Sequence, residues 1–494
     1  MPIARPNIVF IMPDQLRADF LSCYGASFID TPHIDALAAH GVRYQRAYSP
    51  HPVCVAARAA LISGMDAVQS GVLDNGLFLR PDYRACGMHT WPELLDRHDY
   101  YTVATGKMHF YPWEERLGFH RRIIAEDKLW GYIEDDYYHF LAAQGHSKTS
   151  FCDQPEYHQN FMALTSPIPW EYSVDHFVGR ESVRWIEQYD GTRPFAMMVG
   201  FPGPHSPYDP SPEFANFRPE DMPDPLPAVA LDTRAMQAPA ATPKTAAKSW
   251  YAVRNDGSPG REHFLLQRAC YAGLSKQIDH EVGAIVEALR HKGILDNTVI
   301  VFSSDHGDYL GDHGLQGKAS FYESACRVPM IVRHPDIDAS RVCGDLVGLT
   351  DVTATILDLA GCALPGYMEA RPLPALGASS ERPREHLVGA LQQGWMILEG
   401  AWKLSKYAGG SVHLFNLEED PTEQHNRARD PLCTAILQHL DAALTAAIMH
   451  SMSTAFFPQR VYTSSHSSSP DFGRVGWART YPMTWQQLHP EEAS

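Results

Sequence analysis

Residues Thr298-Val299-Ile300-Val301-Phe302-Ser303-Ser304-Asp305-His306 carry the pattern on which the fold prediction rests. An apolar, largely β-branched run stops abruptly at ionisable side chains. Near-continuous apolar runs of this length are typical of strands buried on both faces of a sheet. Three other runs end in the same way, namely Asn7 to Met12 before Asp14, Tyr100 to Ala104 before Lys107 and His109, and Phe195 to Phe201 before His205.

Helical patterns lie between these runs, for example at residues 33–40 and 277–292. Strands that alternate with helices predict an α/β domain built on a mostly parallel sheet flanked by helices. Ligands of such sheets bind beyond the carboxyl ends of the strands. We therefore expect the ionisable side chains at the four strand ends to form one site.

The rest of the chain divides into three predicted parts. Residues 1–375 form the catalytic α/β domain, and the Pro-rich stretch 370–384 marks its boundary. Residues 376–450 form a small α+β domain with short antiparallel strands and a helix at 431–450. Residues 451–494, rich in Ser, Pro and aromatics, form an extended tail, interpreted either as an arm of a homo-oligomer or as a free segment. Within the first part, the excursion 210–260 is interpreted as a loop that covers the substrate.

Composition restricts the partners and the compartment. The formal net charge of −17 argues against nucleic acid, which needs a basic surface. The nine cysteines are scattered, odd in number and without a CxxC pair, so they predict neither a disulfide framework nor a zinc site. A cytoplasmic location is expected. The opening MPIARPNIVFIMPDQ is interpreted as the first strand instead of a signal peptide, and no membrane segment is predicted.

The segment Pro52-Val53-Cys54-Val55-Ala56-Ala57-Arg58-Ala59-Ala60-Leu61-Ile62-Ser63-Gly64 carries the candidate nucleophile. It predicts a helix that ends at Gly64. Cys54 then lies at the helix N-terminus, where anions are favoured, and Arg58 lies on the same helix face. On this segment alone, a small buried cysteine beside a surface arginine is an equally good interpretation.

Cys54-Val55-Ala56-Ala57-Arg58 resembles the sulfatase signature Cys-x-Pro-or-Ala-x-Arg. Other segments resemble that family in the same order along the chain: 6–11 leading to Asp14, Gly106-Lys107-Met108-His109-Phe110, Pro204-His205-Ser206-Pro207, the block 304–318 that ends at Gly317-Lys318, and the turn 414–423. The ordered set spans residues from about 6 to 430. The resemblance implies an alkaline-phosphatase-like fold with a small C-terminal antiparallel sheet domain.

The resemblance also implies the cofactors. Cys54 would be oxidised to 3-oxoalanine (formylglycine) by a formylglycine-generating enzyme. One divalent metal would be bound by the modified Cys54 together with Asp14, Gln15, Asp305 and His306. Hard oxygen ligands favour Ca²⁺, and the histidine makes Mn²⁺ an alternative, with Mg²⁺ as another.

The remaining roles follow from the same resemblance. Lys107 and Arg58 would hold the nucleophile, and Asp305 and His109 would accept protons. His205 and Lys318 would bind sulfate oxygens and protonate the leaving group. Taken singly, these are ordinary surface or core residues, and only their place at matching strand ends favours the functional interpretation. His313 and Asp308 are interpreted as turn residues.

The function expected from the resemblance is hydrolysis of small-molecule sulfate monoesters of the arylsulfatase type. The alternative is a phosphonate monoester or phosphodiester hydrolase with the same site. Gln15 and His306 resemble that branch, and Asn75 is its candidate substrate contact. A phosphomutase or pyrophosphatase is disfavoured because the residues of a second metal site are missing, and a non-catalytic anion binder because the site set is complete. The leaving group stays open; Trp113, Trp130, Tyr137 and Tyr138 are candidates for an apolar pocket.

Overall fold

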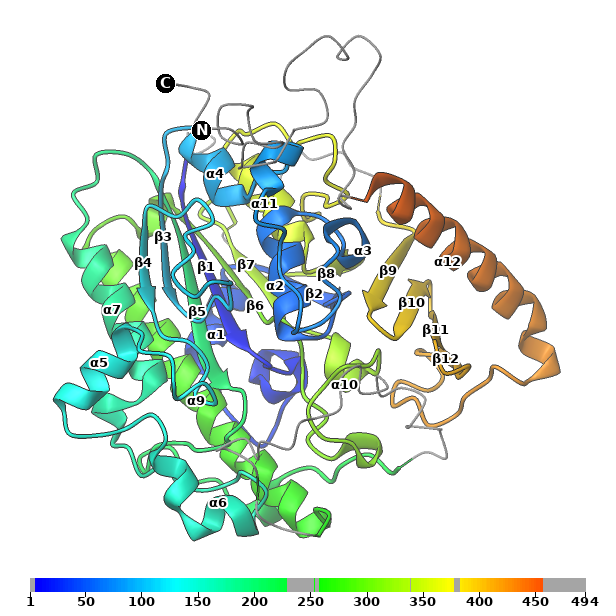
Figure 1. The fold of residues 1–494 in the computed structure, drawn as a ribbon, viewed down its shortest axis with the longest axis horizontal. Helices are drawn as coiled ribbons and strands as arrows, with labels where there is room; N and C mark the ends of the chain where they lie inside the picture. Colours follow the sequence, from blue (N-terminus) through cyan, green and yellow to red (C-terminus); the bar gives the residue numbers. More distant parts are fainter. Residues whose placement is uncertain (1–4, 229–252, 254–256, 338, 377–382, 456–494) are drawn as a thin grey trace, which may run out of the picture.

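The structure is a computed structural model that describes residues 5–228, 253, 257–337, 339–376 and 383–455. An eight-stranded sheet lies between layers of helices, and a smaller sheet lies beside it (Figure 1). The strands of the large sheet are β1 (Asn7–Asp14), β2 (Gly41–Tyr48), β3 (Tyr101–Gly106), β4 (Arg121–Ile124), β5 (Phe195–Pro204), β6 (Thr298–Ser303), β7 (Met330–Arg333) and β8 (Arg341–Gly348).

The large sheet is mostly parallel, as predicted. Its strand order is β4-β3-β5-β1-β6-β7-β2-β8. Only β7 runs antiparallel to its neighbours β6 and β2. The four strands predicted from the sequence are adjacent in the order β3-β5-β1-β6, so their carboxyl ends meet at one edge.

Helices cover both faces of this sheet. The longest is α9, which begins at Arg261 and not near Gln277, because the buried stripe extends back through Leu265, Ala269 and Ala272. Helix α9 ends at His291, and the other α-helices in the described part of the main domain are α1 (Pro32–Ala39), α2 (Cys54–Ser63), α3 (Ala67–Ser70), α4 (Trp91–Asp96), α5 (Asp136–Ala143), α6 (Pro155–Gln159), α7 (Val174–Gln188), α10 (Glu323–Cys326) and α11 (Asp351–Leu359).

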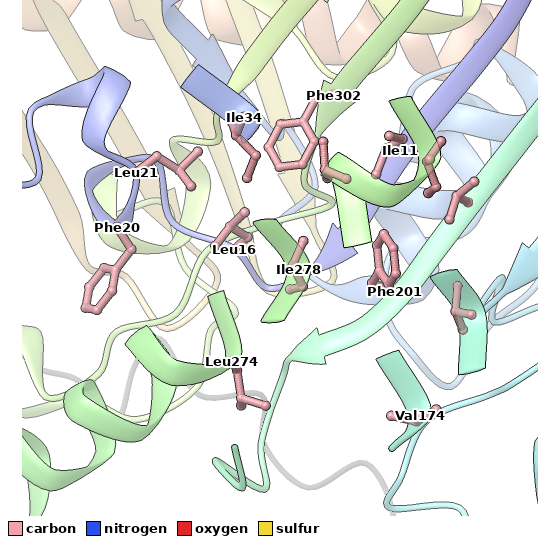
Figure 2. Close-up of a cluster of buried hydrophobic side chains, with 14 of the residues drawn as sticks. Ile11, Leu16, Phe20, Leu21, Ile34, Val174, Phe201, Leu274, Ile278 and Phe302 are labelled. Atoms are coloured by element: carbon pink, nitrogen blue, oxygen red, sulfur yellow. The ribbon is translucent and has the colours of Figure 1, made fainter. Parts of the chain in front are cut away.

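Strand β1 shows why its sequence is apolar throughout. Val9 and Ile11 point into a core formed with α1, α7 and α9, part of which is shown in Figure 2. Ile8 and Phe10 point into the opposite core, formed with α2, α4 and α11. Because side chains alternate between the faces of a strand, a strand buried on both sides needs apolar residues at every position.

The second sheet is antiparallel, as predicted, with the order β12-β11-β10-β9. Its strands are β9 (His386–Leu391), β10 (Gly394–Glu399), β11 (Trp402–Tyr407) and β12 (Val412–Asn416). Helix α12 (Thr434–Thr454) lies along the outer side of this sheet (Figure 1), where Leu440 and Leu444 join a core with Ile397 and Leu404. By length and composition alone, the stretch Pro431–Thr454 is apolar enough to cross a membrane.

A buried group of ionisable side chains lies between the two sheets. Lys403 on β11 lies 2.7 Å from Glu323 of α10 and 2.8 Å from Glu423, which follows β12. Lys403 and Glu423 are almost fully buried. The predicted domain limits at 375 and 450 stay predictions. The predicted tail, from residue 456 on, and most of the predicted substrate-covering loop lie outside the described residues.

Candidate active site

Cys54 is the first residue of α2 and is only 1% exposed. The preceding Val53 is extended and its side chain cannot cap the helix. Instead, Asn75 accepts a hydrogen bond from the backbone N–H of Val55 at 2.9 Å. The helix ends at Gly64 in the left-handed conformation, as predicted. The sequence thus places a buried cysteine at a helix N-terminus that a neighbouring loop completes.

Four of the predicted metal ligands converge. One ligand atom from each of Asp14, Cys54, Asp305 and His306 lies within 4.8 Å of all the others, and all four residues are buried. The sulfur of Cys54 lies 3.2 Å from Nε2 of His306. Nδ1 of His306 lies 2.9 Å from the carbonyl of Gly307, which holds Nε2 toward the cluster. A thiolate, an imidazole and two carboxylates in one buried group are suited to bind a divalent cation.

Arg58 lies behind this cluster instead of against the nucleophile. Its guanidinium donates to Oδ2 of Asp14 and Oδ2 of Asp305, both at 2.9 Å, and to the carbonyl of Lys107 at 2.6 Å. The inner Oδ1 atoms of the two carboxylates remain on the side of Cys54 and His306. Arg58 therefore balances the charge of the two carboxylates and fixes their orientation, because breaking such a buried pair is costly.

Lysine and histidine side chains surround Cys54. Lys107 lies 2.9 Å from Asp14, and Lys318 lies 2.8 Å from Nε2 of His205. Burial alone would raise the pKa of the Cys54 thiol, but the positive charges of Lys318, His306 and Lys107 lower it well below its ordinary value. These positive charges therefore favour the ionised form of the Cys54 thiol; the sulfate-binding roles of Lys318 and His205 stay predictions.

Gln15 lies in the site but is already engaged. Its side-chain oxygen accepts a hydrogen bond from Lys318 at 2.6 Å, and its amide group donates to Asp308. Its backbone N–H donates to Asp305 at 3.0 Å. The role of Gln15 as a metal ligand stays a prediction. Asp308 does accept the N–H of Leu310 as a turn residue, but it also orients Gln15.

His109 follows β3 in a left-handed backbone conformation, with φ of 60°. Its ring lies close enough to Cys54 to lower the pKa of that thiol. Neither ring nitrogen has a nitrogen or oxygen partner in the described part of the chain. Because a buried polar nitrogen without a partner is costly, this ring is available to a substrate or to the modified nucleophile.

Close approach of two strands sets the position of Lys107. Gly106 ends β3 with φ of 93°, and a Cβ there would lie 2.0 Å from the carbonyl oxygen of Gly200. The N–H of Lys107 donates to that same carbonyl at 2.8 Å. Only glycine tolerates this contact at this backbone angle. The Gly-Lys pair therefore brings the Lys107 ammonium to Asp14.

Sequence reasoning missed three consecutive residues, Glu126, Asp127 and Lys128. Glu126 accepts the backbone N–H of His109 at 3.1 Å. Asp127 lies 2.6 Å from Lys107 and 3.6 Å from His205. Lys128 donates to Asp209 and, at 3.0 Å, to the carbonyl of Pro207. These residues follow β4, so the same strand-end rule would have found them had β4 been predicted.

The aromatic residues proposed for an apolar pocket differ in their distance from the site. Trp113 and Trp130 lie near His109, with ring centroids 6.0 and 6.4 Å away. The expectation for Tyr137 was wrong, because its ring is buried in the core against Phe177. Tyr138 likewise packs on the neighbouring His139 of helix α5 and makes no ring contact with the site among the described residues. His313 has φ of 56°, consistent with the predicted turn.

Comparisons with known proteins agree with this geometry. The sulfatase family model matches residues 6–362, and a model for the C-terminal part of N-sulphoglucosamine sulphohydrolase matches residues 311–450. An arylsulfatase of Clostridium perfringens is 29% identical over 456 residues, which cover 85% of this chain and 90% of that protein. A choline-sulfatase of Rhizobium meliloti is 29% identical over 456 residues, covering 87% and 84%. In fold, the chain is similar to the phosphonate monoester hydrolase of Agrobacterium radiobacter, with a TM-score of 0.76, 24% identity and coverage of 90% and 96%.

Proposed function

We propose that this chain, which belongs to the sulfatase family and is a sulfuric ester hydrolase, cleaves small sulfate monoesters with a formylglycine made from Cys54 and one divalent metal ion. The observation that carries the proposal is the position of Cys54. It is a buried thiol at a helix N-terminus, within 4.8 Å of ligand atoms from Asp14, Asp305 and His306.

The donor set fits such a metal ion. Asp14 and Asp305 offer carboxylate oxygens, His306 offers Nε2, and Sγ of Cys54 stands where an oxygen of formylglycine would be. Gln15 would add an amide oxygen after release of Lys318. Oxygen-rich sets favour Ca²⁺, and the imidazole makes Mn²⁺ or Mg²⁺ alternatives. A metal at this position would lower the pKa of a bound hydroxyl and polarise the sulfate.

Hydrated formylglycine supplies two hydroxyls on one carbon, one to attack sulfur and one to help expel sulfate. The chain's own residues handle the protons and charges around it. Asp305 would take the first proton, and His109 would take the second. Support for the role of His109 is that its ring nitrogens have no nitrogen or oxygen partner in the described part of the chain. Lys318 and His205, 2.8 Å apart, would bind sulfate oxygens and protonate the leaving group.

Maturation of Cys54 requires a formylglycine-generating enzyme as a partner. The signature here reads Cys54-Val55-Ala56-Ala57-Arg58, with alanine where the common aerobic converting system prefers proline. We therefore expect conversion to depend on the expression host. Peptide mass spectrometry should find formylglycine at position 54 in active preparations. Fully active protein that contains only unmodified Cys54 would refute this part of the proposal.

The experiment that tests the function is a comparison of substrates. We would measure kcat/KM for an aryl sulfate and for the matching aryl phosphonate monoester, with metal present, for wild type and Cys54→Ala. A preference for sulfate that is lost in the variant supports the proposal. A preference for the phosphonate would instead support the second candidate, a phosphonate monoester or phosphodiester hydrolase. The specific observation in its favour is the neutral Gln15 beside Lys318.

We also propose a cytoplasmic location and, with the C-terminal tail as an arm, a homo-oligomer. Support for the location is that the nine cysteines are scattered along the sequence, odd in number and without a CxxC pair, which suits a reducing compartment. Fractionation of the native host would test the location, and light scattering of the full chain would test the oligomer. Recovery of the protein outside the cytoplasm, or a monomer at working concentration, would refute the respective proposal.

A further inference from the structure

The side chain of Gln15 is held at both ends of its amide group. The amide oxygen accepts a hydrogen bond from the ammonium of Lys318 at 2.6 Å, and the amide nitrogen donates to Oδ2 of Asp308. Gln15 is 1% exposed, and Asp308 is fully buried. A flipped amide would direct its NH₂ group at the ammonium and its oxygen at the carboxylate, so both contacts would become repulsive. The two neighbours therefore permit only one orientation of the amide.

The backbone of Gln15 is also held in one conformation. Its φ is 71°, in the left-handed region that residues other than glycine seldom adopt. Its N–H donates to Asp305 at 3.0 Å, and its carbonyl accepts a hydrogen bond from the hydroxyl of Tyr271. Residues in such conformations persist where their surroundings determine them, and they cluster at functional sites. The backbone and the side chain together place the amide oxygen at one point beside Lys318.

Asp308 is fixed by further partners. Its Oδ1 accepts the backbone N–H of Leu310 at 3.1 Å, and its Oδ2 accepts the hydroxyl of Tyr208 at 2.7 Å. Both partners are donors, so both oxygens of Asp308 have to act as acceptors. An asparagine at this position has only one acceptor oxygen and could not satisfy the partners on both sides. The carboxylate is therefore needed for the orientation of the Gln15 amide.

The two lysines of the site differ in their neighbours. Lys107 lies 2.9 Å from the carboxylate of Asp14 and 2.6 Å from that of Asp127. Lys318 pairs with no carboxylate in the described part of the chain. Its ammonium contacts the amide oxygen of Gln15 and, at 2.8 Å, Nε2 of His205, and neither group carries a negative charge. The charge of Lys318 is therefore left for an anion that enters the site.

Given the proposed function, on which this inference rests, we infer that Asp308 is a positioning residue of the active site. Its carboxylate orients the Gln15 amide with the oxygen toward Lys318 and the predicted metal position. A neutral amide there holds Lys318 without cancelling its charge. A carboxylate at position 15 would cancel that charge and would lie against Asp308. Asp308 thus acts through Gln15 on the binding of both the metal ion and the sulfate group.

An exchange of donor and acceptor groups tests these contacts. In Asp308→Asn, the backbone N–H of Leu310 keeps the remaining oxygen, so the new NH₂ group faces the NH₂ group of Gln15. We expect the Gln15 amide to flip and to direct its NH₂ group at Lys318. Adding Gln15→Glu restores an acceptor toward both neighbours, because a carboxylate accepts hydrogen bonds at both oxygens. The double variant also keeps the total charge of the wild type.

The measurements are dissociation constants, obtained by calorimetric titration of Ca²⁺ and, with Ca²⁺ present, of inorganic sulfate. We expect Asp308→Asn to weaken Ca²⁺ binding about 10- to 100-fold and sulfate binding about tenfold. The double variant should regain the Ca²⁺ affinity, because an oxygen again faces the metal position. Its sulfate affinity should stay low, because the carboxylate at position 15 cancels the charge of Lys318. Asp358→Asn, at an exposed position on α11, is the matched control and should change neither constant.

Several results would overturn the inference. Unchanged constants in Asp308→Asn would mean that Asp308 orients nothing. A loss of Ca²⁺ affinity that Gln15→Glu does not repair would mean that Asp308 only packs its loop. Full recovery of sulfate affinity in the double variant, or no sulfate binding by wild type, would mean that the unpaired charge of Lys318 is not used.

Gln15→Glu alone provides a second variant if Asp308→Asn does not fold. At a pH well above the ordinary pKa of glutamate it places a carboxylate against Asp308 and beside Lys318, so sulfate binding should weaken about tenfold. An unchanged constant would contradict the inference equally. All of these readouts are binding constants. A wild type that binds both ions but hydrolyses no sulfate ester would therefore refute the proposed function and leave the role of Asp308 to be decided by the variants.

Discussion

The guanidinium of Arg58 lies between the carboxylates of Asp14 and Asp305 and compensates their negative charge. A bound divalent cation would compensate part of the same charge. Replacing Arg58 by leucine leaves two buried carboxylates uncompensated, so we expect a loss of about 3–5 kcal/mol in the free energy of unfolding. Added Ca²⁺ should restore part of it. Denaturant unfolding with Ca²⁺ and with EDTA measures both values. Arg218→Leu, at an exposed position, is the control. Equal losses with and without Ca²⁺ would contradict the shared role.

Asp127 is the residue through which Lys107 and His205 are linked. Burial lowers the pKa of Lys107, but the negative charges of Asp127 and Asp14 raise it, and the pKa ends above its ordinary value. Asp127→Asn removes one of them, so the pKa of Lys107 should fall and the alkaline limb of kcat/KM should move to lower pH. We expect kcat/KM itself to fall about 10- to 100-fold. Profiles of kcat/KM against pH, with Asp296→Asn as the exposed control, measure this. A lower rate with an unmoved alkaline limb would point to a packing role only.

At this scale the sequence indicated the residues at the ends of apolar strands, including Asp14, Lys107, His205 and Asp305. It did not indicate Asp127, because β4 reads Arg-Arg-Ile-Ile at the sheet edge and lacks an apolar run. It also did not indicate that Arg58 pairs with Asp14 and Asp305. Spacing on a helix places two side chains on one face, but the partner across the gap depends on strands far away in the sequence.

At the scale of elements, the N-terminus of α2 depends on Asn75 from a separate loop. Loss of a helix cap costs about 1 kcal/mol, so Asn75→Ala should lower the free energy of unfolding by that amount. Asn75→Asp keeps the acceptor oxygen and should retain most of the stability. Urea unfolding and KM would be measured together for both variants. A raised KM with unchanged stability would instead identify Asn75 as the substrate contact considered from the sequence.

Central strands were predictable and peripheral ones were not. β1, β3, β5 and β6 are apolar at nearly every position because helices cover them on both sides. β2 reads Gly-Val-Arg-Tyr-Gln-Arg-Ala-Tyr and lies next to the edge strand β8, so polar side chains interrupt its apolar pattern. A partly solvated strand carries less signal in its sequence than a fully buried one.

At the scale of the whole molecule, the group of Lys403, Glu323 and Glu423 connects the small sheet with helix α10 and, through Glu323, with Tyr48 of β2. Burial raises the pKa of Glu423 to about 7, above its value in an unfolded chain. The native state therefore holds a proton that the unfolded state releases above about pH 4.5. The stability from this group is full below that pH and is lost as pH rises toward 7, by up to about 1.4 kcal/mol per pH unit.

Glu423→Gln should remove this dependence. The difference in unfolding free energy between wild type and variant is expected to decrease steadily from pH 4.5 to 7.5. Glu419→Gln, at an exposed position on the same turn, is the control and should show no such trend. Chemical denaturation at several pH values supplies the numbers. A difference that stays constant with pH would mean that Glu423 is ionised in the native state throughout.

Both sheets were expected from the sequence, but their junction was not. The patterns at residues 386–416 predict short antiparallel strands, and the structure has them. From the sequence, Lys403 would be interpreted as an ordinary solvated lysine in a strand. Only the folded chain shows that Glu323 lies beside it. Long-range charge pairing is not recorded in any local pattern.

The order of strands in the large sheet also determines how much time passes, during synthesis, between the appearance of Cys54 and the completion of the sheet beside it. β1 is completed early, yet its partner β6 begins only at Thr298. At about 5–20 residues per second, roughly ten to fifty seconds pass between the synthesis of Cys54 and that of β6. Because Cys54 is 1% exposed in the folded chain, a modifying enzyme would need to act during this interval, before the sheet is complete. Under the proposed maturation, the proportion of active molecules is therefore decided while the chain is still being made, and a thiol that misses this interval stays a thiol for the life of the folded protein.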